Sequence, residues 1–398
     1  MTTARGLAAR RIATCGAAGA FDDGVVIMDH GKIQWVGPRA GAPAGVPIED
    51  LGERVITPGL VDAHTHAAWA GSRHAEYAVR MAGGDYRAIA AAGGGILSSM
   101  RALAATTEEA VYEALVARLR RMARLGVTCV EVKSGYGLEP ALELLQLRAI
   151  ARAAAQDDLP RVVPTFLALH ALPERARASA ATRAEYIEYA AGPLLKEVVE
   201  GGLARFVDAY VDANAFTVDE ARRVTVPAKA AGLGVRLHVG QFADVGGAEL
   251  CAEMGARSAD HLEHVSDAGI QRLAAAGTAA VLLPTASFTL GQSPPPVARL
   301  RDAGVSLVVA SDANPGTAPT ESLPLALAFA VRLYGLTPDE ALLAATRTAA
   351  ASLDVAGGAL EIGAPADLVV WDLPHEHAIV QPWGVPKTHR VLRSGREI

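Results

Sequence analysis

Gly59-Leu60-Val61-Asp62-Ala63-His64-Thr65-His66 is the stretch that decides the fold. An apolar run, residues 55–61, leads into two histidines that are one residue apart. Side chains alternate between the two faces of a strand, so His64 and His66 point to the same side. Two imidazoles on one side of a strand end can hold one metal ion together. The alternative is a polar strand end without a ligand role, and the rest of the chain has to separate the two interpretations.

Composition limits the classes of protein to consider. The chain has 398 residues, 51% of them hydrophobic, which is enough for a large core in one or two domains. The formal net charge is -6 and no Lys/Arg run occurs, so no nucleic-acid partner is expected. Cys15, Cys129 and Cys251 form no CxxC motif, which indicates a reducing, cytoplasmic location. No window approaches about 18 uninterrupted apolar residues, so no membrane partner is expected.

The two ends of the chain have the same β-rich texture. Clear strand candidates near the N-terminus are residues 24–28 and 33–36, and near the C-terminus residues 366–372 and 389–393. Neither end has enough apolar residues for a core of its own. We therefore expect both ends to combine into one small β-sandwich domain. The expected boundaries are residues 1–57 and 358–398 for its two parts, with residues 58–357 inserted between them.

The middle of the chain alternates strand-like apolar runs with helix-like stretches rich in Ala and Leu. The expected strands are residues 60–66, 127–133, 162–169, 206–211, 234–239, 258–262, 279–284 and 305–310. The expected helices are residues 107–125, 139–155, 184–200, 217–231, 246–254, 267–276 and 293–303, followed by a helical block over 320–352. This alternation predicts an α/β fold, a (β/α)8 TIM-like barrel. A doubly wound open sheet would need a Gly-rich loop after an early strand, whereas Gly93-Gly94-Gly95 follows a helical stretch and is interpreted as a loop near the barrel mouth.

Barrel active sites lie at the C-terminal ends of the strands, and this rule selects candidate ligands. The side chains at or just after predicted strand ends are His64, His66, His170, His238, His261 and Asp312. Three imidazoles and one carboxylate suit one divalent ion, zinc or iron, with a position left for water. The predicted fourth strand ends without a lysine that could bridge two ions, which favours a site with one ion. Asp260, Glu131 and Lys133 are candidates for orienting the ligands.

Six motifs carry a resemblance to a known family. They are Asp62-Ala63-His64-Thr65-His66, Ala70-Gly71-Ser72-Arg73, Ala92-Gly93-Gly94-Gly95-Ile96-Leu97, Glu131-Val132-Lys133-Ser134-Gly135-Tyr136-Gly137, Ala259-Asp260-His261-Leu262 and Ser311-Asp312-Ala313-Asn314-Pro315-Gly316. With them the chain resembles the amidohydrolase superfamily and, within it, the imidazolonepropionase family. The resemblance implies hydrolysis of 4-imidazolone-5-propanoate to N-formimidoyl-L-glutamate in histidine degradation, by a homodimer.

The resemblance also implies roles for individual residues. His64, His66, His238 and Asp312 would bind zinc or iron, and Asp312 and His261 would be the catalytic residues. Arg73 would pair with the substrate's carboxylate, which a guanidinium can grip bidentately. The other implied substrate-binding residues are Tyr86, Tyr136, His170, Gln241, Asn314, Gly316 and Thr317. Val239-Gly240 departs from the family pattern, in which an acidic residue precedes the position of Gln241, so Asp312 and His261 remain as the candidates for proton transfer.

Two other functions fit parts of the pattern. One is a deaminase of an aminated heterocycle such as a purine, a triazine or guanine, which would share the metal site. Arg73 and the Lys133-Ser134-Gly135-Tyr136 loop favour a small carboxylated imidazolone instead. The other is a non-catalytic barrel with a vestigial site, against which the complete ligand set argues.

Overall fold

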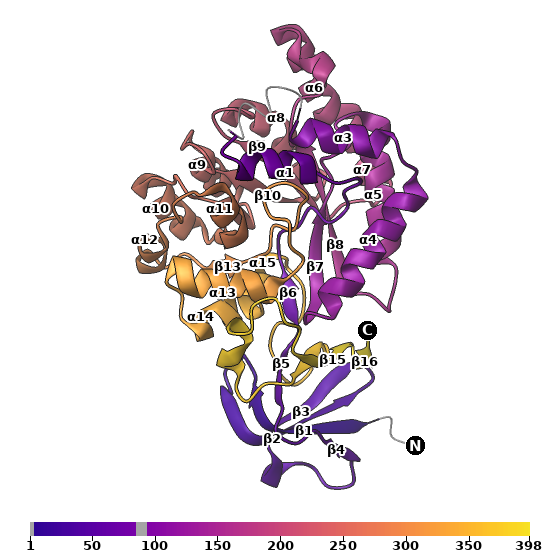
Figure 1. Ribbon diagram of the computed structural model, residues 1–398, viewed down its shortest axis with the longest axis vertical. Coiled ribbons are helices and arrows are strands. Elements are labelled where there is room, and N and C mark those ends of the chain that lie inside the picture. The colour runs from indigo at the N-terminus through magenta and orange to yellow at the C-terminus, as the bar shows by residue number, and fades with distance from the viewer. Residues whose placement is uncertain (1–3, 85–93) are drawn as a thin grey trace.

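Two hydrogen-bonded sheets organise the protein, a parallel barrel and a mixed sheet built from both ends of the chain (Figure 1). The computed structural model describes residues 4–84 and 94–398. The mixed sheet lies at one end of the molecule, and α1 (His74–Met81), α3 (Ile96–Ala104) and α6 (Ala180–Tyr189) lie at the opposite end.

The barrel sheet contains eight parallel strands that follow the order of the sequence. They are β6 (Leu60–Asp62), β7 (Val127–Lys133), β8 (Arg161–Leu169), β9 (Phe206–Val211), β10 (Gly234–Val239), β11 (Ser258–His261), β12 (Ala279–Leu282) and β13 (Leu307–Val309). An isolated parallel bridge between Thr65 and Ala313 joins the ends of the first and last strands. Each predicted strand overlaps one observed strand, so the predicted barrel is confirmed.

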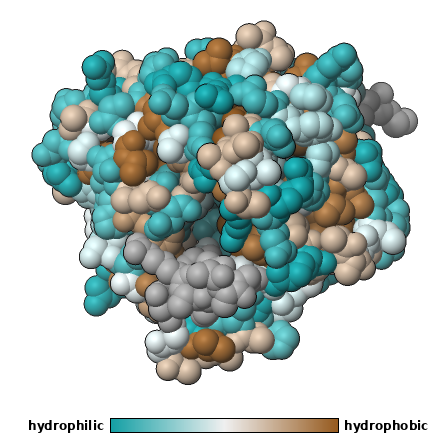
Figure 2. All heavy atoms as spheres, turned by 90° about the horizontal axis from the view of Figure 1, so that it is seen from above, coloured by the Kyte–Doolittle hydropathy of each residue, from teal (hydrophilic) through white to brown (hydrophobic). Residues whose placement is uncertain are grey.

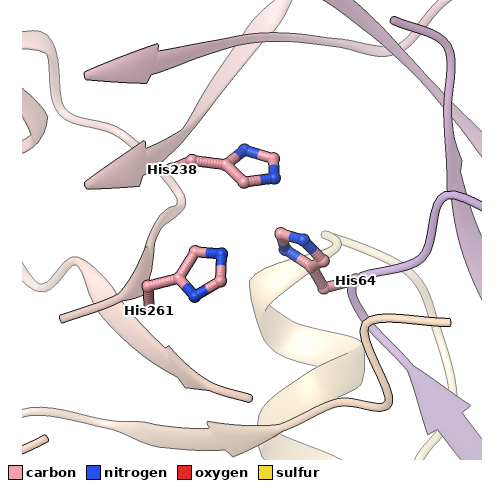
Figure 3. A group of neighbouring side chains, drawn as sticks. All are labelled: His64, His238 and His261. Atoms are coloured by element: carbon pink, nitrogen blue, oxygen red, sulfur yellow. The ribbon is translucent and has the colours of Figure 1, made fainter. Parts of the chain in front are cut away.

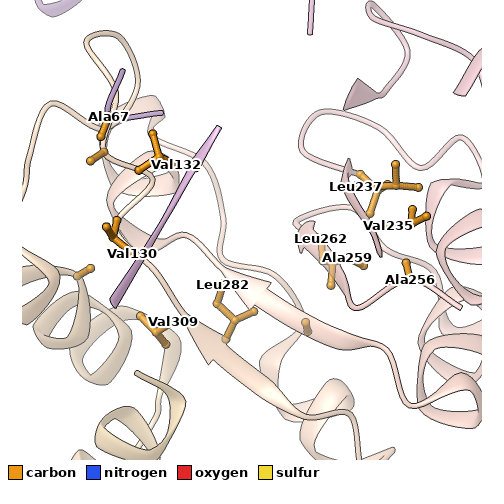
Figure 4. Packing of buried hydrophobic residues seen from close by; sticks show 14 of the residues in the cluster. Ala67, Val130, Val132, Val235, Leu237, Ala256, Ala259, Leu262, Leu282 and Val309 are labelled. Atoms are coloured by element: carbon orange, nitrogen blue, oxygen red, sulfur yellow. The ribbon is translucent and has the colours of Figure 1, made fainter. Parts of the chain in front are cut away.

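Helices surround the barrel and pack on the outward side chains of its strands. Beyond α1, α3 and α6, they are α4 (Glu108–Ala123), α5 (Pro140–Ala154), α7 (Leu195–Glu200), α8 (Val218–Ala230), α9 (Gly247–Met254), α10 (Asp267–Ala276), α11 (Pro284–Leu290), α12 (Val297–Asp302), α13 (Leu323–Tyr334), α14 (Pro338–Ala344) and α15 (Arg347–Ser352). Val130 and Val132 of β7 and Val235 and Leu237 of β10 belong to this outer core (Figure 4). In the part of the chain that the structure describes, no helix combines the length and apolar character needed to cross a membrane.

Three helices and one interruption differ from the sequence-based expectation. The sequence pattern did not predict α1, α3 or α11, because these helices are short and lie in connections. The single helix expected over residues 184–200 is interrupted by a π-helical turn, Ala190–Leu194, which contains Pro193. Proline lacks an N–H and its ring clashes with the carbonyl four residues earlier, so the regular α-helical pattern is lost there.

The mixed sheet confirms that both ends of the chain build one β unit. Its strands are β1 (Arg5–Ala13), β2 (Ala20–Asp29), β3 (Lys32–Pro38), β4 (Ile48–Asp50), β5 (Val55–Pro58), β14 (Leu368–Trp371), β15 (Thr388–Arg393) and β16 (Arg396–Glu397). Antiparallel pairing of β14 with β5 attaches the C-terminal strands to the N-terminal ones. All eight strands form one continuous hydrogen-bonded sheet.

Gly59 connects the two sheets, since β5 ends just before it and β6 begins just after it. A Cβ at Gly59 would overlap the side chain of Thr128 on β7. The absence of a side chain therefore lets the chain pass directly from the mixed sheet into the barrel. His64 and His66 come directly after β6.

Five fully buried ionisable side chains form one cluster in the barrel interior: Lys133, Glu131, Asp208, Arg236 and Asp260. The Lys133 ammonium donates to Glu131 (2.9 Å) and to Asp208 (2.7 Å), and it lies 3.6 Å from Asp260. Burial alone would lower the pKa of Lys133, but the three carboxylates raise the pKa overall, so the ammonium stays charged. Buried charges persist only when they are paired, so these residues form one interdependent network.

Lys133→Met should destabilise the protein by about 3–5 kcal/mol, because it leaves buried carboxylates without their cation. The measurement is equilibrium urea unfolding of the full chain in the presence of a chelator, so that loss of a metal ion does not contribute. Lys196→Met is the matched control, since Lys196 makes only an exposed pair with Glu200 at 3.8 Å. Its effect should stay within about 1 kcal/mol. Equal effects of the two substitutions would show that the network does not stabilise the barrel.

Candidate metal centre and substrate cavity

Four side chains from three barrel strands converge at the C-terminal end of the barrel. His64 and His66 follow β6, His238 lies on β10 and Asp312 follows β13. Asp312 Oδ1 is 3.5 Å from Nε2 of both His64 and His66, and the Nε2 atoms of His66 and His238 are 3.3 Å apart. Ligands at about 2.0–2.1 Å around a tetrahedral ion lie about 3.3–3.4 Å from one another. These three separations match those between ligands of one ion. The ligand atoms of His64, His66 and Asp312 lie within 4.8 Å of one another, and so do those of His64, His238 and His261.

The chemical state of these imidazoles also fits a metal ion. Burial lowers the pKa of His64, His66 and His238 well below the usual value, so the rings are neutral and each offers a lone pair. His64 Nε2 is buried and has no hydrogen-bond partner within residues 4–84 and 94–398. A buried acceptor of this kind is the atom that a bound cation would satisfy.

Carboxylates of the interior network orient two of the rings. His64 Nδ1 donates to Asp260 (2.7 Å), and His238 Nδ1 lies 2.9 Å from Asp208. Asp208 also accepts from the backbone N–H of His238 at 3.2 Å. Contacts of this kind fix the ring so that Nε2 faces the ion. The sequence pointed to Asp260 but not to Asp208, whose position inside the apolar run of β9 was the available signal.

Asp312 is held by the same contacts that join the first and last strands. Its backbone N–H donates to His64 O (3.1 Å), and Ser311 donates to Asp62 from both its N–H (3.0 Å) and its hydroxyl (2.6 Å). Burial raises the pKa of Asp312 to about 7, although His261 favours the charged form. In the absence of a bound cation, this carboxyl is poised to take up or release a proton near neutral pH.

His261 completes the polar end of the barrel. Its ring points towards His64 and His238, with ring centroids 6.0 and 5.5 Å away (Figure 3). Burial alone would lower the pKa of His261, but Glu263, Asp312 and Asp260 raise the pKa overall. Sequence reasoning missed Glu263, although it lies only two residues beyond His261.

A cavity of about 550 Å³ opens above these residues. Figure 2, which looks onto this end of the molecule, shows a hollow lined with hydrophilic side chains near the centre of the face. The cavity is lined by His66, His238, His261 and Asp312 and by the predicted substrate residues Arg73, Tyr136, His170, Gln241, Asn314 and Thr317. Gly316 lies against the Arg73 guanidinium, where a Cβ would overlap it. Tyr86, the remaining predicted substrate residue, lies outside the described residues.

Helix α4 supports the segment that carries Arg73. Arg118 on α4 donates to Ala67 O (3.0 Å) and Trp69 O (2.9 Å) and stacks over the Trp69 ring. These bonds hold the segment that connects the histidine pair to Arg73. The Arg73 side chain pairs with Glu76 at 2.9 Å and is only 5% exposed. It is one of the residues that line the cavity.

Tyr136 and His170 also line the cavity, and their ring centroids lie 5.4 Å apart. Glu143 on α5 accepts from the N–H groups of Gly135 (3.2 Å) and Gly137 (2.9 Å) on either side of Tyr136. His170 Nδ1 donates to Gly135 O at 2.8 Å, which leaves Nε2 as the acceptor of the neutral ring. Burial lowers the pKa of His170 to about 4, so this ring is neutral at physiological pH.

Gln241 is held by Tyr210, a residue that the sequence pattern did not single out. Tyr210, at the end of β9, donates its hydroxyl to Gln241 Oε1 (2.8 Å), and both residues line the cavity. Gly240 adopts a φ of +67°, a conformation that favours glycine, and so turns Gln241 towards the cavity. Glycine at position 240, where the family pattern has an acidic residue, therefore fits the backbone conformation of this turn.

Comparisons with known proteins identify the family of the chain. The amidohydrolase family model matches residues 55–398. Imidazolonepropionase of Myxococcus xanthus is 42% identical over 94% of this chain and 89% of the relative, and that of Paracoccus denitrificans is 41% identical over 96% and 95%. Among solved structures, a zinc-bound adenosine deaminase from Xanthomonas campestris has a TM-score of 0.72 at 19% identity, covering 98% of this chain and 92% of that one. A triazine hydrolase variant has a TM-score of 0.73 at 16% identity, covering 99% and 94%.

The two kinds of likeness differ in what they show. At 16–19% identity the solved structures share only the fold, and they select no substrate. The curated relatives are more than twice as similar and align along nearly the whole chain. The chain belongs to the imidazolonepropionase family of the amidohydrolases.

Proposed function

We propose that this chain opens the ring of 4-imidazolone-5-propanoate by hydrolysis of its cyclic amide C–N bond, giving N-formimidoyl-L-glutamate in histidine degradation. The observation that carries the proposal is that Arg73 and three of the four candidate metal ligands, His66, His238 and Asp312, line one cavity, with the fourth ligand, His64, 3.5 Å from Asp312. The first can bind a carboxylate, and the others can hold an ion next to the ring. The names of the curated relatives support the same reaction.

One divalent ion, zinc or iron, held by His64, His66, His238 and Asp312, would lower the pKa of a bound water and so make a nucleophile available near neutral pH. Asp312 accepts the proton of the attacking water and returns it to the ring nitrogen as the C–N bond breaks. His261 faces the carbonyl oxygen and stabilises the charge that develops there. Arg73 holds the propionate group and thereby fixes which ring carbon faces the water.

We also propose a cytoplasmic location and a homodimer. The three cysteines support the first, because Cys15, Cys129 and Cys251 are all free, as is usual in a reducing compartment. The homodimer rests on the family resemblance. Sedimentation of the purified full chain measures it directly.

The purified protein should contain one zinc or iron ion per chain and should open 4-imidazolone-5-propanoate. Removal of the ion by a chelator should abolish turnover, and adding the ion back should restore it, because the water is activated only beside the cation. Asp312→Ala should remove nearly all turnover. The measurements are elemental analysis and loss of imidazolone absorbance, with release of ammonia from aminated heterocycles as the control reaction. Ammonia release without ring opening would replace this proposal with a deaminase.

Arg73→Met should raise KM for imidazolonepropionate by about 10–100-fold and change kcat less, because a charge-assisted contact to the carboxylate is worth about 1.5–3 kcal/mol. The matched substrate is the propanamide analogue, which has no negative charge. On it, wild type and Arg73→Met should have similar KM values. Arg148→Met is the control variant, since Arg148 pairs with Glu108 on the surface. An equal loss on both substrates would mean that Arg73 supports the fold and does not bind the carboxylate.

A further inference from the structure

Glu263 lies immediately beyond β11 and has no role in the reaction as described above. Its side chain is only 1% exposed, and Oε2 lies 3.7 Å from His261 Nδ1. Its other oxygen, Oε1, accepts from the Ser287 hydroxyl of α11 at 2.6 Å. The same Ser287 hydroxyl is 2.6 Å from the hydroxyl of Tyr334 on α13. One helix therefore contacts this buried carboxylate directly, through Ser287, and a second helix contacts Ser287.

The direction of these hydrogen bonds follows from the donors available. A carboxylate only accepts, so Ser287 uses its single hydroxyl proton on Glu263. Tyr334 must then donate to Ser287, which has no second proton to offer. Glu263 Oε2 and His261 Nδ1 face each other, and neither has another hydrogen-bond partner in the described parts of the chain. The chain of donors from Tyr334 to Ser287 thus leaves Oε2 directed at the His261 ring.

We infer that Glu263 is a positioning residue for the proposed hydrolysis: it keeps the proton of His261 on Nδ1 and directs Nε2 of the same ring towards the substrate carbonyl. This inference deepens the proposed function and rests on it for its catalytic part. The 3.7 Å separation is longer than a hydrogen bond. Such contacts are often long without substrate and shorten when the complex forms.

The backbone around His261 supports the inference independently. His261 and the next residue, Leu262, have φ values of +84° and +71°, a conformation that L side chains rarely adopt. The N–H groups of Leu262 and His264 donate to Val239 O (3.1 Å) and Gly240 O (2.8 Å), which holds this turn against the end of β10. Backbone strain that the surroundings maintain is concentrated at functional positions. Here the turn brings the Glu263 carboxylate back to the His261 ring.

A spectroscopic test needs no turnover. In the zinc-loaded full chain labelled with 15N-histidine, His261 should carry its proton on Nδ1, and His261→Ala should assign the resonance by removing it. Glu263→Gln keeps the acceptor for Ser287 but presents an amide N–H to His261, so the ring proton should move to Nε2. A wild-type ring with its proton on Nε2, or the same tautomer in both proteins, would overturn the inference.

Kinetics with imidazolonepropionate test the catalytic part. Glu263→Gln should lower kcat by about 10–100-fold, the usual effect of removing a partner that orients a functional histidine, with KM almost unchanged. Ser287→Ala should cause a smaller loss that disappears in the Glu263→Gln background, because Ser287 acts through Glu263. Thr289→Ala is the matched control on α11, since the Thr289 hydroxyl donates to its own helix at Thr285 O, and it should keep wild-type kcat.

The outcomes separate the two proposals. Wild-type kcat in Glu263→Gln, or losses that multiply in the double variant, would refute the positioning role while the ring opening stands. A wild-type protein with the Nδ1 tautomer but no ring opening would refute the proposed function while the contact of Glu263 with His261 stands.

Discussion

The buried ammonium of Lys133 is the interaction on which the rest of the structure depends. An ion at 0% exposure is tolerated only with carboxylates around it, and Glu131, Asp208 and Asp260 supply them. Two of these carboxylates also contact the imidazoles of His64 and His238. The ring orientation at the candidate metal site is therefore coupled to charge pairing inside the barrel. With Arg236, this buried network contains two cationic and three carboxyl side chains below the site where a cation would bind.

The metal side and the substrate side of the cavity are supported by different parts of the fold. Interior strand residues hold the ligands, whereas α4 and α5 hold the loops that carry Arg73 and Tyr136. Gln146 on α5 connects those two loops, because it donates to Ala68 O (2.9 Å) and accepts from the N–H of Tyr136 (3.1 Å). The substrate side of the cavity therefore rests on helix-to-loop hydrogen bonds, separate from the charge pairing inside the barrel.

The sequence predicted the barrel because the strands depend on local signals, and the structure brings the candidate ligands from the predicted strand ends together. Apolar runs mark the strands, and histidines at strand ends mark the site. Asp208, Tyr210 and Glu263 were missed because their roles depend on partners distant in sequence. Asp208 and Tyr210 are two residues apart on β9, so their side chains point to the same side of the strand. A charged residue within this apolar run could have indicated a partner inside the barrel. The partner of Glu263, Ser287, lies on a short helix that the pattern did not predict.

Closure of the barrel and assembly of the candidate metal site depend on the same contacts. Asp62 on the first strand accepts two hydrogen bonds from Ser311, and His64 O accepts from the N–H of Asp312. Asp312 has a φ of +55°, a strained conformation that costs about 1–3 kcal/mol for a residue other than glycine. The closing hydrogen bonds offset that strain, and they place the carboxylate opposite His64 and His66. Histidines separated from Asp312 by almost the whole barrel therefore become its neighbours only when the last strand meets the first.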